Sequence, residues 1–108
     1  MTLEQKIGQF FFPAVFINDT EENIQETERL IKKHNIGGLT FFHSRASAAT
    51  NYETKKKVTF NDDSYERLKE LVIRFQKCAS TPLLMSIDAE WGLAMRVEKT
   101  PQYPYAIT

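Results

Sequence analysis

Three short apolar, β-rich runs, separated by amphipathic segments, constrain the fold more than any other feature of this sequence. The runs cover residues 9–17, 36–43 and 83–88. Between them, apolar side chains at spacings of three and four predict helices over residues 21–34 and 64–78. Strands that alternate with helices are typical of parallel strands joined by right-handed crossovers. We therefore expect an α/β fold with its three strands parallel, adjacent and in chain order, and with both helices on one side.

Two capping patterns mark the beginnings of helices. Thr2 with Gln5 three residues later fits a capping box and predicts a helix of one or two turns at the start of the chain. Asp19 with Glu22 is a second capping-box candidate, placed just before the first amphipathic helix.

Proline and glycine residues lie within or beside two of the predicted strands. The run over residues 9–17 is typical of a strand buried on both faces, with Pro13 near its end or at a bulge. Gly37 and Gly38 predict a close backbone approach at the start of the second strand. Residues 44–63 carry few apolar side chains and are long for a loop, so we expect an exposed functional or inserted loop there.

Composition removes several classes of function. Fourteen basic residues balance fourteen acidic ones, so no net charge favours nucleic acid or an anionic membrane as a partner. The longest apolar stretch, residues 10–17, is far shorter than the roughly 20 residues that a membrane span needs. There is no phosphate-binding loop or dinucleotide motif, so no cofactor is expected. Cys78, the one cysteine, excludes an internal disulfide and is expected to be a buried, inert thiol.

The segment after the third predicted strand holds the candidate chemistry. Asp88 falls at the carboxyl end of that strand, the edge at which α/β sheets and barrels bind ligands. It could equally cap the turn that follows. Glu90 lies two residues further on, but this spacing alone is weak evidence for a pair of catalytic carboxylates. Glu90 could instead bond the local backbone or pair with Arg96.

Three other side chains belong to the same argument. Trp91 could form an apolar platform under a sugar ring or close the mouth of a barrel. Arg96 could donate to a sugar hydroxyl or form a salt bridge with one of the two acidic residues. His43 ends the second predicted strand and shares the ligand-binding edge, whereas His34 ends a helix and is expected at the surface. Neither histidine has the spacing of a metal ligand, so no metal site is expected.

Three segments resemble the N-terminal domain of glycoside hydrolase family 3. They cover residues 2–9, 36–42 and 82–92, and the last contains Ile-Asp, then Glu and Gly, with Arg96 eight residues after Asp88. The Asp-Ala-Glu-Trp-Gly variant is similar to the β-N-acetylhexosaminidase branch, although the commoner pattern has Gln at position 89 and Gly at 91. The resemblance implies that residues 1–108 are a partial domain, truncated at its C-terminus: about three β/α units from the N-terminal portion of a TIM (β/α)8 barrel.

The resemblance also implies roles. Asp88 matches an aspartate that binds hydroxyls of the sugar at the non-reducing end, and Arg96 matches an arginine of the same subsite; with Trp91 they form the expected substrate-binding set. The family retains anomeric configuration through a covalent glycosyl-enzyme. Its nucleophilic aspartate and its acid/base residue, a histidine in the hexosaminidase branch, lie later in such proteins, so no catalytic residue is assigned to this chain and the rest of the barrel is missing from it.

The parent protein is accordingly expected to be an exo-glycosidase, most simply a β-N-acetylhexosaminidase, acting on β-linked N-acetylglucosamine or glucose. The isolated chain is expected to be inactive. A β-glucosidase-type parent and a non-catalytic carbohydrate-binding or interaction module remain as alternatives. The sequence does not determine the cellular compartment, and the periplasm or cell envelope is suspected for the parent enzyme.

Overall fold

The computed structural model describes residues 1–45, 60–90 and 92–104 of the chain. They form a small α/β domain with a three-stranded parallel sheet and three α-helices. In chain order the elements are α1 (Leu3–Gly8), β1 (Ala14–Phe16), α2 (Glu21–His34), β2 (Gly38–Phe42), α3 (Ser64–Cys78), β3 (Leu84–Ile87) and the short 3₁₀ helix η2 (Leu93–Met95). None of the helices in these ranges is both long and apolar enough to cross a bilayer.

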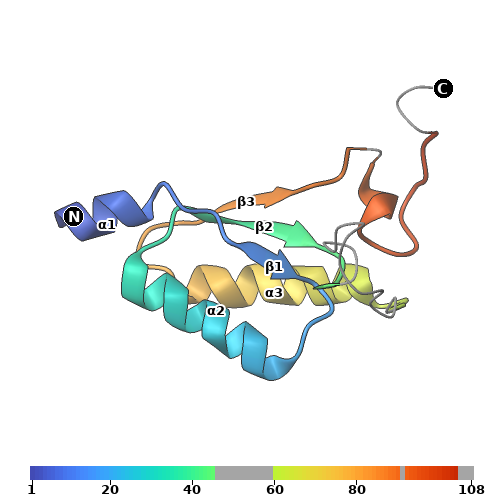
Figure 1. Cartoon of the computed structure of the whole chain (residues 1–108). Coiled ribbons are helices and arrows are strands. Elements are labelled where there is room, and N and C mark those ends of the chain that lie inside the picture. The colour runs from blue at the N-terminus through green and yellow to red at the C-terminus, as the bar shows by residue number, and fades with distance from the viewer. Residues whose placement is uncertain (46–59, 91, 105–108) are drawn as a thin grey trace, which may run out of the picture.

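The predicted strand arrangement is confirmed. The sheet order is β1-β2-β3, and both pairings are parallel. Helices α2 and α3 lie side by side on one face of the sheet, and α1 extends from its amino edge (Figure 1). The segment that follows β3, including η2, lies at the opposite, carboxyl edge (Figure 1).

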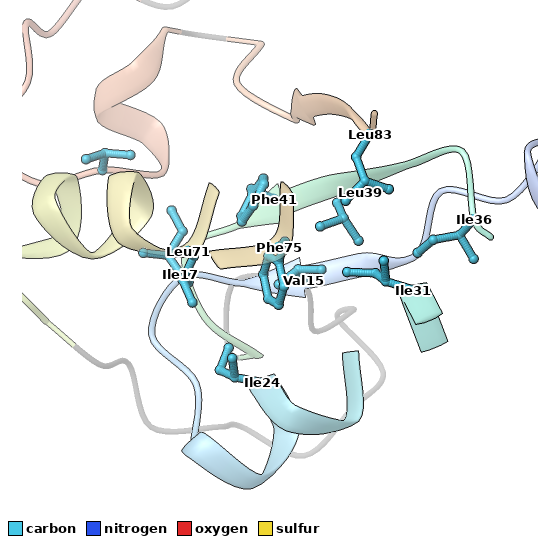
Figure 2. Close-up of a cluster of buried hydrophobic side chains, with 11 residues drawn as sticks. Val15, Ile17, Ile24, Ile31, Ile36, Leu39, Phe41, Leu71, Phe75 and Leu83 are labelled. Carbon is cyan, nitrogen blue, oxygen red and sulfur yellow. The ribbon is translucent and has the colours of Figure 1, made fainter. Parts of the chain in front are cut away.

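One hydrophobic core joins the two long helices to the sheet. Alternate residues of the strands point toward the helices, because successive side chains of a strand face opposite sides. They meet one apolar stripe from each helix (Figure 2). The buried side chains are those of Val15, Ile17, Ile24, Ile31, Ile36, Leu39, Phe41, Leu71, Phe75, Leu83 and Val97.

The other face of the sheet is uncovered by any described helix. Ala14, Thr40 and Ser86 are in register across the three strands, and a hydrogen bond of 2.9 Å joins the hydroxyls of Thr40 and Ser86. Leu84, at the amino end of β3, is exposed on this face. The sheet therefore has one apolar face, covered by the helices, and one open face with short side chains at its centre, two of which carry hydroxyls.

The helix ends follow the sequence with one correction. Thr2 and Gln5 form the predicted capping box of α1. The second predicted box is wrong: Thr20, rather than Asp19, is the N-cap of α2, and its hydroxyl accepts a hydrogen bond from the backbone N–H of Asn23. Asp19 instead accepts from the backbone N–H of Thr20 and from the side-chain amide of Asn23.

The first strand is much shorter than predicted. Only residues 14–16 pair in the sheet, whereas Phe10, Phe11 and Phe12 are exposed and precede the strand. Pro13 has no N–H to donate and joins the ladder only through its carbonyl oxygen, which accepts from the backbone N–H of Thr40 at 3.1 Å, so the strand begins just after it. The expectation of a strand buried on both faces across residues 9–17 is therefore corrected.

The glycine pair behaves as predicted. A Cβ at Gly37 would lie 2.0 Å from the carbonyl oxygen of Gln9, and one at Gly38 would lie 2.2 Å from that of Leu84. Both positions need glycine because backbone passes where a side chain would stand. Of the long loop predicted over residues 44–63, positions 46–59 lie outside the described residues.

Cys78 is half-buried rather than fully buried. Its thiol donates to a carboxylate oxygen of Glu28 at 3.1 Å. Desolvation, together with this carboxylate, raises the pKa of the Cys78 thiol. A raised pKa keeps the sulfur in its weakly reactive thiol form, in line with the inert role expected of it.

Candidate functional site

The carboxyl edge of the sheet collects aromatic and charged side chains on its open face. Phe16 and Phe42 are register partners at the ends of β1 and β2, with ring centroids 6.2 Å apart. Phe41 pairs with Ile87, so Asp88, the next residue along, continues the row that contains Phe42. Asp88 thus stands where the sequence predicted it, just past the carboxyl end of β3.

A sharp return of the chain brings Arg96 back to Asp88. Gly92 has a φ of 99°, a conformation that favours glycine, and η2 follows it directly. The Nε–H of Arg96 donates to the backbone carbonyl oxygen of Asp88 at 2.5 Å. Its Nη2 lies 3.6 Å from Oδ2 of the same residue. The sequence-predicted pair is therefore assembled by this turn.

Arg96 is held between Asp88 and the Phe42 ring. Its guanidinium carbon lies 5.0 Å from the centre of the Phe42 ring, a cation–π arrangement, and its side chain is only 8% exposed. The side chain of Asp88 is 53% exposed. The arginine is thus immobilised, whereas its partner carboxylate faces solvent and can accept hydrogen bonds from a ligand.

A second arginine repeats the arrangement on the neighbouring strand. Arg45 places its guanidinium carbon 4.8 Å from the centre of the Phe16 ring and pairs with Asp19 at 3.1 Å. Unlike Arg96, its side chain is largely exposed. The carboxyl edge therefore carries two arginines, each over a phenylalanine and each beside an aspartate.

Behind this edge lies a partly buried polar cluster centred on Glu98. One of its carboxylate oxygens lies 2.5 Å from Nε2 of His43 and accepts the backbone N–H of Asn61 at 3.1 Å. The other accepts the hydroxyl of Ser64, and Ser64 in turn accepts the backbone N–H of Glu98 at 2.9 Å. Three parts of the chain meet at this carboxylate: the end of β2, the segment that follows η2, and the start of α3.

The contact with Glu98 indicates which ring nitrogen of His43 carries hydrogen. The Asn18 side-chain oxygen accepts from the Asn61 amide at 2.7 Å, so its amide nitrogen faces His43 and donates to the histidine's carbonyl oxygen at 3.1 Å. That amide nitrogen also lies 3.2 Å from Nε2 of His43. The shorter contact, with Glu98, makes Nε2 the donor, because a carboxylate offers only acceptors, and the contact with the Asn18 amide nitrogen is then not a hydrogen bond. His43 therefore points away from the open face, into the layer behind it.

The pKa of Glu98 reflects this environment. Burial by itself would raise it, but hydrogen bonds from the Ser64 hydroxyl, from the backbone N–H groups of Asn61 and of Glu98 itself, and from His43 together lower the pKa below its usual value. Donors to the charged form stabilise that form. Glu98 is thus an ionised, partly buried carboxylate at neutral pH.

The two ends of the sheet differ in chemistry. A hollow of about 490 Å³ lies beside Arg96 and is lined in part by His43, Glu98 and Phe60. A larger hollow, of about 650 Å³, lies at the amino edge between α1 and α2 and is mainly apolar, with Ile7 and Phe11 among its lining residues. Polar groups able to orient a small polar ligand gather at the carboxyl edge, so we place the candidate site there, although Asp88 is not among the residues that line the smaller hollow.

The other sequence-predicted residues fall as follows. Trp91 lies outside the described residues. Glu90 is exposed and lies beyond the end of β3, so the common face expected for strand residues two apart does not apply to it and Asp88. His34 is at the surface as predicted. No group of His, Cys, Asp and Glu suited to a metal ion occurs in the described parts of the chain.

Sequence reasoning missed the cluster around Glu98. Its members, Asn18, His43, Asn61, Ser64 and Glu98, are dispersed along the chain and share no recognisable spacing. Only His43 carried a signal, because it ends a predicted strand at the ligand-binding edge.

Comparison with known proteins adds no further constraint. No family model matches the sequence, and neither a curated protein nor a solved structure is significantly similar to it.

Proposed function

We propose that this chain is part of a glycoside hydrolase of family 3 type and contributes a carbohydrate-binding subsite built from Asp88 and Arg96. The observation that carries the proposal is the pairing of an open carboxylate with an immobilised guanidinium at the carboxyl edge of a parallel sheet. Sugars are bound by such sets of oriented acceptors and donors beside aromatic surface. The sequence resemblance supports the same assignment.

The barrel is the finer part of the proposal. Neither β1 nor β3 has a second strand neighbour among the described residues, so the sheet has two open edges. Its uncovered face carries short side chains at the centre, Ala14, Thr40 and Ser86, which suits the filled interior of a closed barrel. Helices on one face only are also the arrangement of a barrel's outer ring. Five further β/α units would complete it.

In such an enzyme Asp88 and Arg96 would bind and orient the sugar at the non-reducing end rather than cleave the bond. The proposed parent is a β-N-acetylhexosaminidase acting by retention, with a nucleophilic aspartate and an acid/base residue supplied by a later part of the barrel. A β-glucosidase-type parent fits the same geometry. The subsite would take a β-linked N-acetylglucosamine or glucose residue.

A non-catalytic carbohydrate-binding module is the second candidate. It is favoured by one observation: Asp88, Arg96 and the Phe42 ring, which contact one another, all belong to this chain. Binding without cleavage would then be the function of the chain itself.

Translating the reading frame beyond the codon for Thr108 separates the two candidates. Five more β/α units with a candidate nucleophilic aspartate would support the enzyme, whereas a stop codon at that point would favour the module. Binding is tested directly by titrating the ¹⁵N-labelled chain with N-acetylglucosamine, glucose and galactose. Shifts confined to the Asp88 and Arg96 amides support the subsite. No response to any of the sugars, in the chain or in a longer protein containing it, would contradict it.

A further inference from the structure

The segment that carries Arg96 is fastened to the rest of the domain just beyond that residue. In the described part of the chain, the hydrogen bonds of Arg96 stay within the segment: its side chain donates to Asp88, and the backbone N–H groups of Arg96 and Val97 donate to Leu93. Its interaction with another element is the cation–π contact with Phe42 of β2. Core packing and hydrogen bonds to other elements come at the next two positions. Val97 is fully buried in the core, and Glu98 bonds to the ends of β2 and α3.

Val97 and Glu98 fasten the segment in different ways. An apolar side chain in a core is held by packing, which is not directional. Glu98 is held by directional bonds to His43, Ser64 and the backbone of Asn61, each on a regular element or next to one. Because these bonds are directional, they fix the position and orientation of the backbone at Glu98. Arg96 is only two residues away, so its position is constrained as well.

The charge of Glu98 is not what stability alone would select. A carboxylate that is only 19% exposed loses much of its hydration, and an apolar side chain of similar size often serves stability as well or better. A buried ionic contact is better explained where it specifies one arrangement among several. Here the arrangement specified is that of the segment from Asp88 to Glu98.

We propose that Glu98 is a positioning residue of the carboxyl-edge site: by joining the segment after β3 to β2 and α3, it sets where Arg96 stands and so how the Asp88 carboxylate is presented. The idea that this carboxylate meets a sugar rests on the proposed function. The positioning itself does not, because it can be measured in the chain without any ligand.

The experiment compares Glu98→Ala, Glu98→Gln and a control, Lys99→Ala, in the ¹⁵N-labelled 108-residue chain. Lys99 is the adjacent residue, and its side chain forms an exposed ion pair with Asp62, at 3.4 Å. The first readout is hydrogen exchange of the Met95, Arg96 and Val97 amides, relative to the amides of β2. The second is the ring ¹⁵N spectrum of His43, which reports whether Nε2 carries the hydrogen.

In Glu98→Ala the three amides should exchange roughly ten- to a hundredfold faster, the range expected for losing hydrogen bonds to a charged group, and the Nε2–H signature should be lost. Glu98→Gln keeps an acceptor for His43 and should restore the signature and most of the protection. Lys99→Ala should change neither. A residue that merely added stability would raise exchange uniformly, without the signature change or the rescue.

Unchanged protection of the three amides in a folded Glu98→Ala chain would overturn the proposal. So would failure of Glu98→Gln to rescue. If Glu98→Ala does not fold, Ser64→Ala removes one bond to the carboxylate without removing the charge, and it should still speed the same amides several-fold. An absence of sugar binding in the wild type would count against the proposed function alone, since none of these measurements contains sugar.

Discussion

The Nε–H of Arg96 donates to the backbone carbonyl oxygen of Asp88, 2.5 Å away and eight residues earlier in the chain. This bond joins the two ends of the segment after β3, and the Arg96 guanidinium also makes a cation–π contact with the Phe42 ring. The Asp88 carboxylate is left facing solvent. The strand end, the turn and the aromatic ring therefore act together to present one acceptor group.

Asp88 should bind sugar rather than attack it. In a complete parent enzyme, Asp88→Ala removes an ionised acceptor whose bonds to hydroxyls are each worth roughly 1.5 to 3 kcal/mol, so kcat/KM should fall about 30- to 1,000-fold. Glu90→Ala, which removes an exposed carboxylate two residues away, is the matched control and should change kcat/KM little. Steady-state kinetics on a chromogenic N-acetylglucosaminide measure both.

Trapping the covalent intermediate distinguishes binding from nucleophilic attack. A fluorinated sugar should still label a later aspartate in the Asp88→Ala parent. Labelling of Asp88 itself in the wild type, or no labelling of the variant at any sugar concentration, would make Asp88 the nucleophile and contradict the assignment.

Arg96 and Arg45 should differ in their contribution to stability although both lie over a phenylalanine. Arg96→Ala removes a nearly buried side chain and its bond to Asp88, and should lower the free energy of unfolding by about 1 to 3 kcal/mol. Arg45→Ala removes a largely exposed side chain, and its partner Asp19, although only 8% exposed, keeps the hydrogen bonds from Thr20 and Asn23, so the loss should be less than about 1 kcal/mol. Urea unfolding at pH 7 compares them, and equal losses would show that burial does not decide the difference.

Glu98 should make stability depend on pH in the acid range. Its pKa is lower in the folded chain than its ordinary value of 4.5, so the unfolded state binds the proton more readily. The stabilisation is therefore fully present above about 4.5 and is lost as the pH falls through the lower pKa of the folded state. The difference in unfolding free energy between wild type and Glu98→Gln should shrink over that interval, and a difference that stays constant from pH 7 to pH 3 would refute the linkage.

Leu71 and Ile73 of α3 provide a matched pair of substitutions, one at a buried and one at an exposed position. Leu71 is 1% exposed and Ile73, two residues on, is 55% exposed. Leu71→Ala should cost about 2 to 4 kcal/mol of unfolding free energy, because it removes buried surface and leaves a cavity between α3 and the sheet. Ile73→Ala should cost about 0.5 kcal/mol or less. Chemical denaturation of the two variants tests whether the assigned face of α3 is correct.

The helices and the strand order were predictable because their signals are local and periodic. Apolar spacing in residues 21–34 and 64–78 matches α2 and α3 at both ends. The sequence predicts a first strand that is too long, because an aromatic run predicts burial whether or not the backbone is paired. Phe10 and Phe11 show the difference: they are apolar, yet they precede Pro13 and lie exposed.

The candidate site was predictable only along one stretch of chain. Asp88 and Arg96 are close in sequence, so position and resemblance sufficed to join them. Glu98 could not be connected to His43 and Ser64, because they lie 55 and 34 residues away and meet only when three elements pack. Contacts of that kind depend on the fold, and single-sequence patterns do not contain them.

The hydroxyl pair of Thr40 and Ser86 also makes the alignment of β3 along β2 unique. Sliding β3 by two residues would keep every side chain on its own face, so the hydrophobic pattern alone tolerates that error. It would, however, place Ser86 opposite Gly38 or Phe42, neither of which has a hydroxyl. It would also break the hydrogen bond from the Ser86 hydroxyl to the carbonyl oxygen of Leu39. Two small polar residues thus discriminate against a mispaired sheet, and with it against an Asp88 displaced by roughly 7 Å along the strand direction.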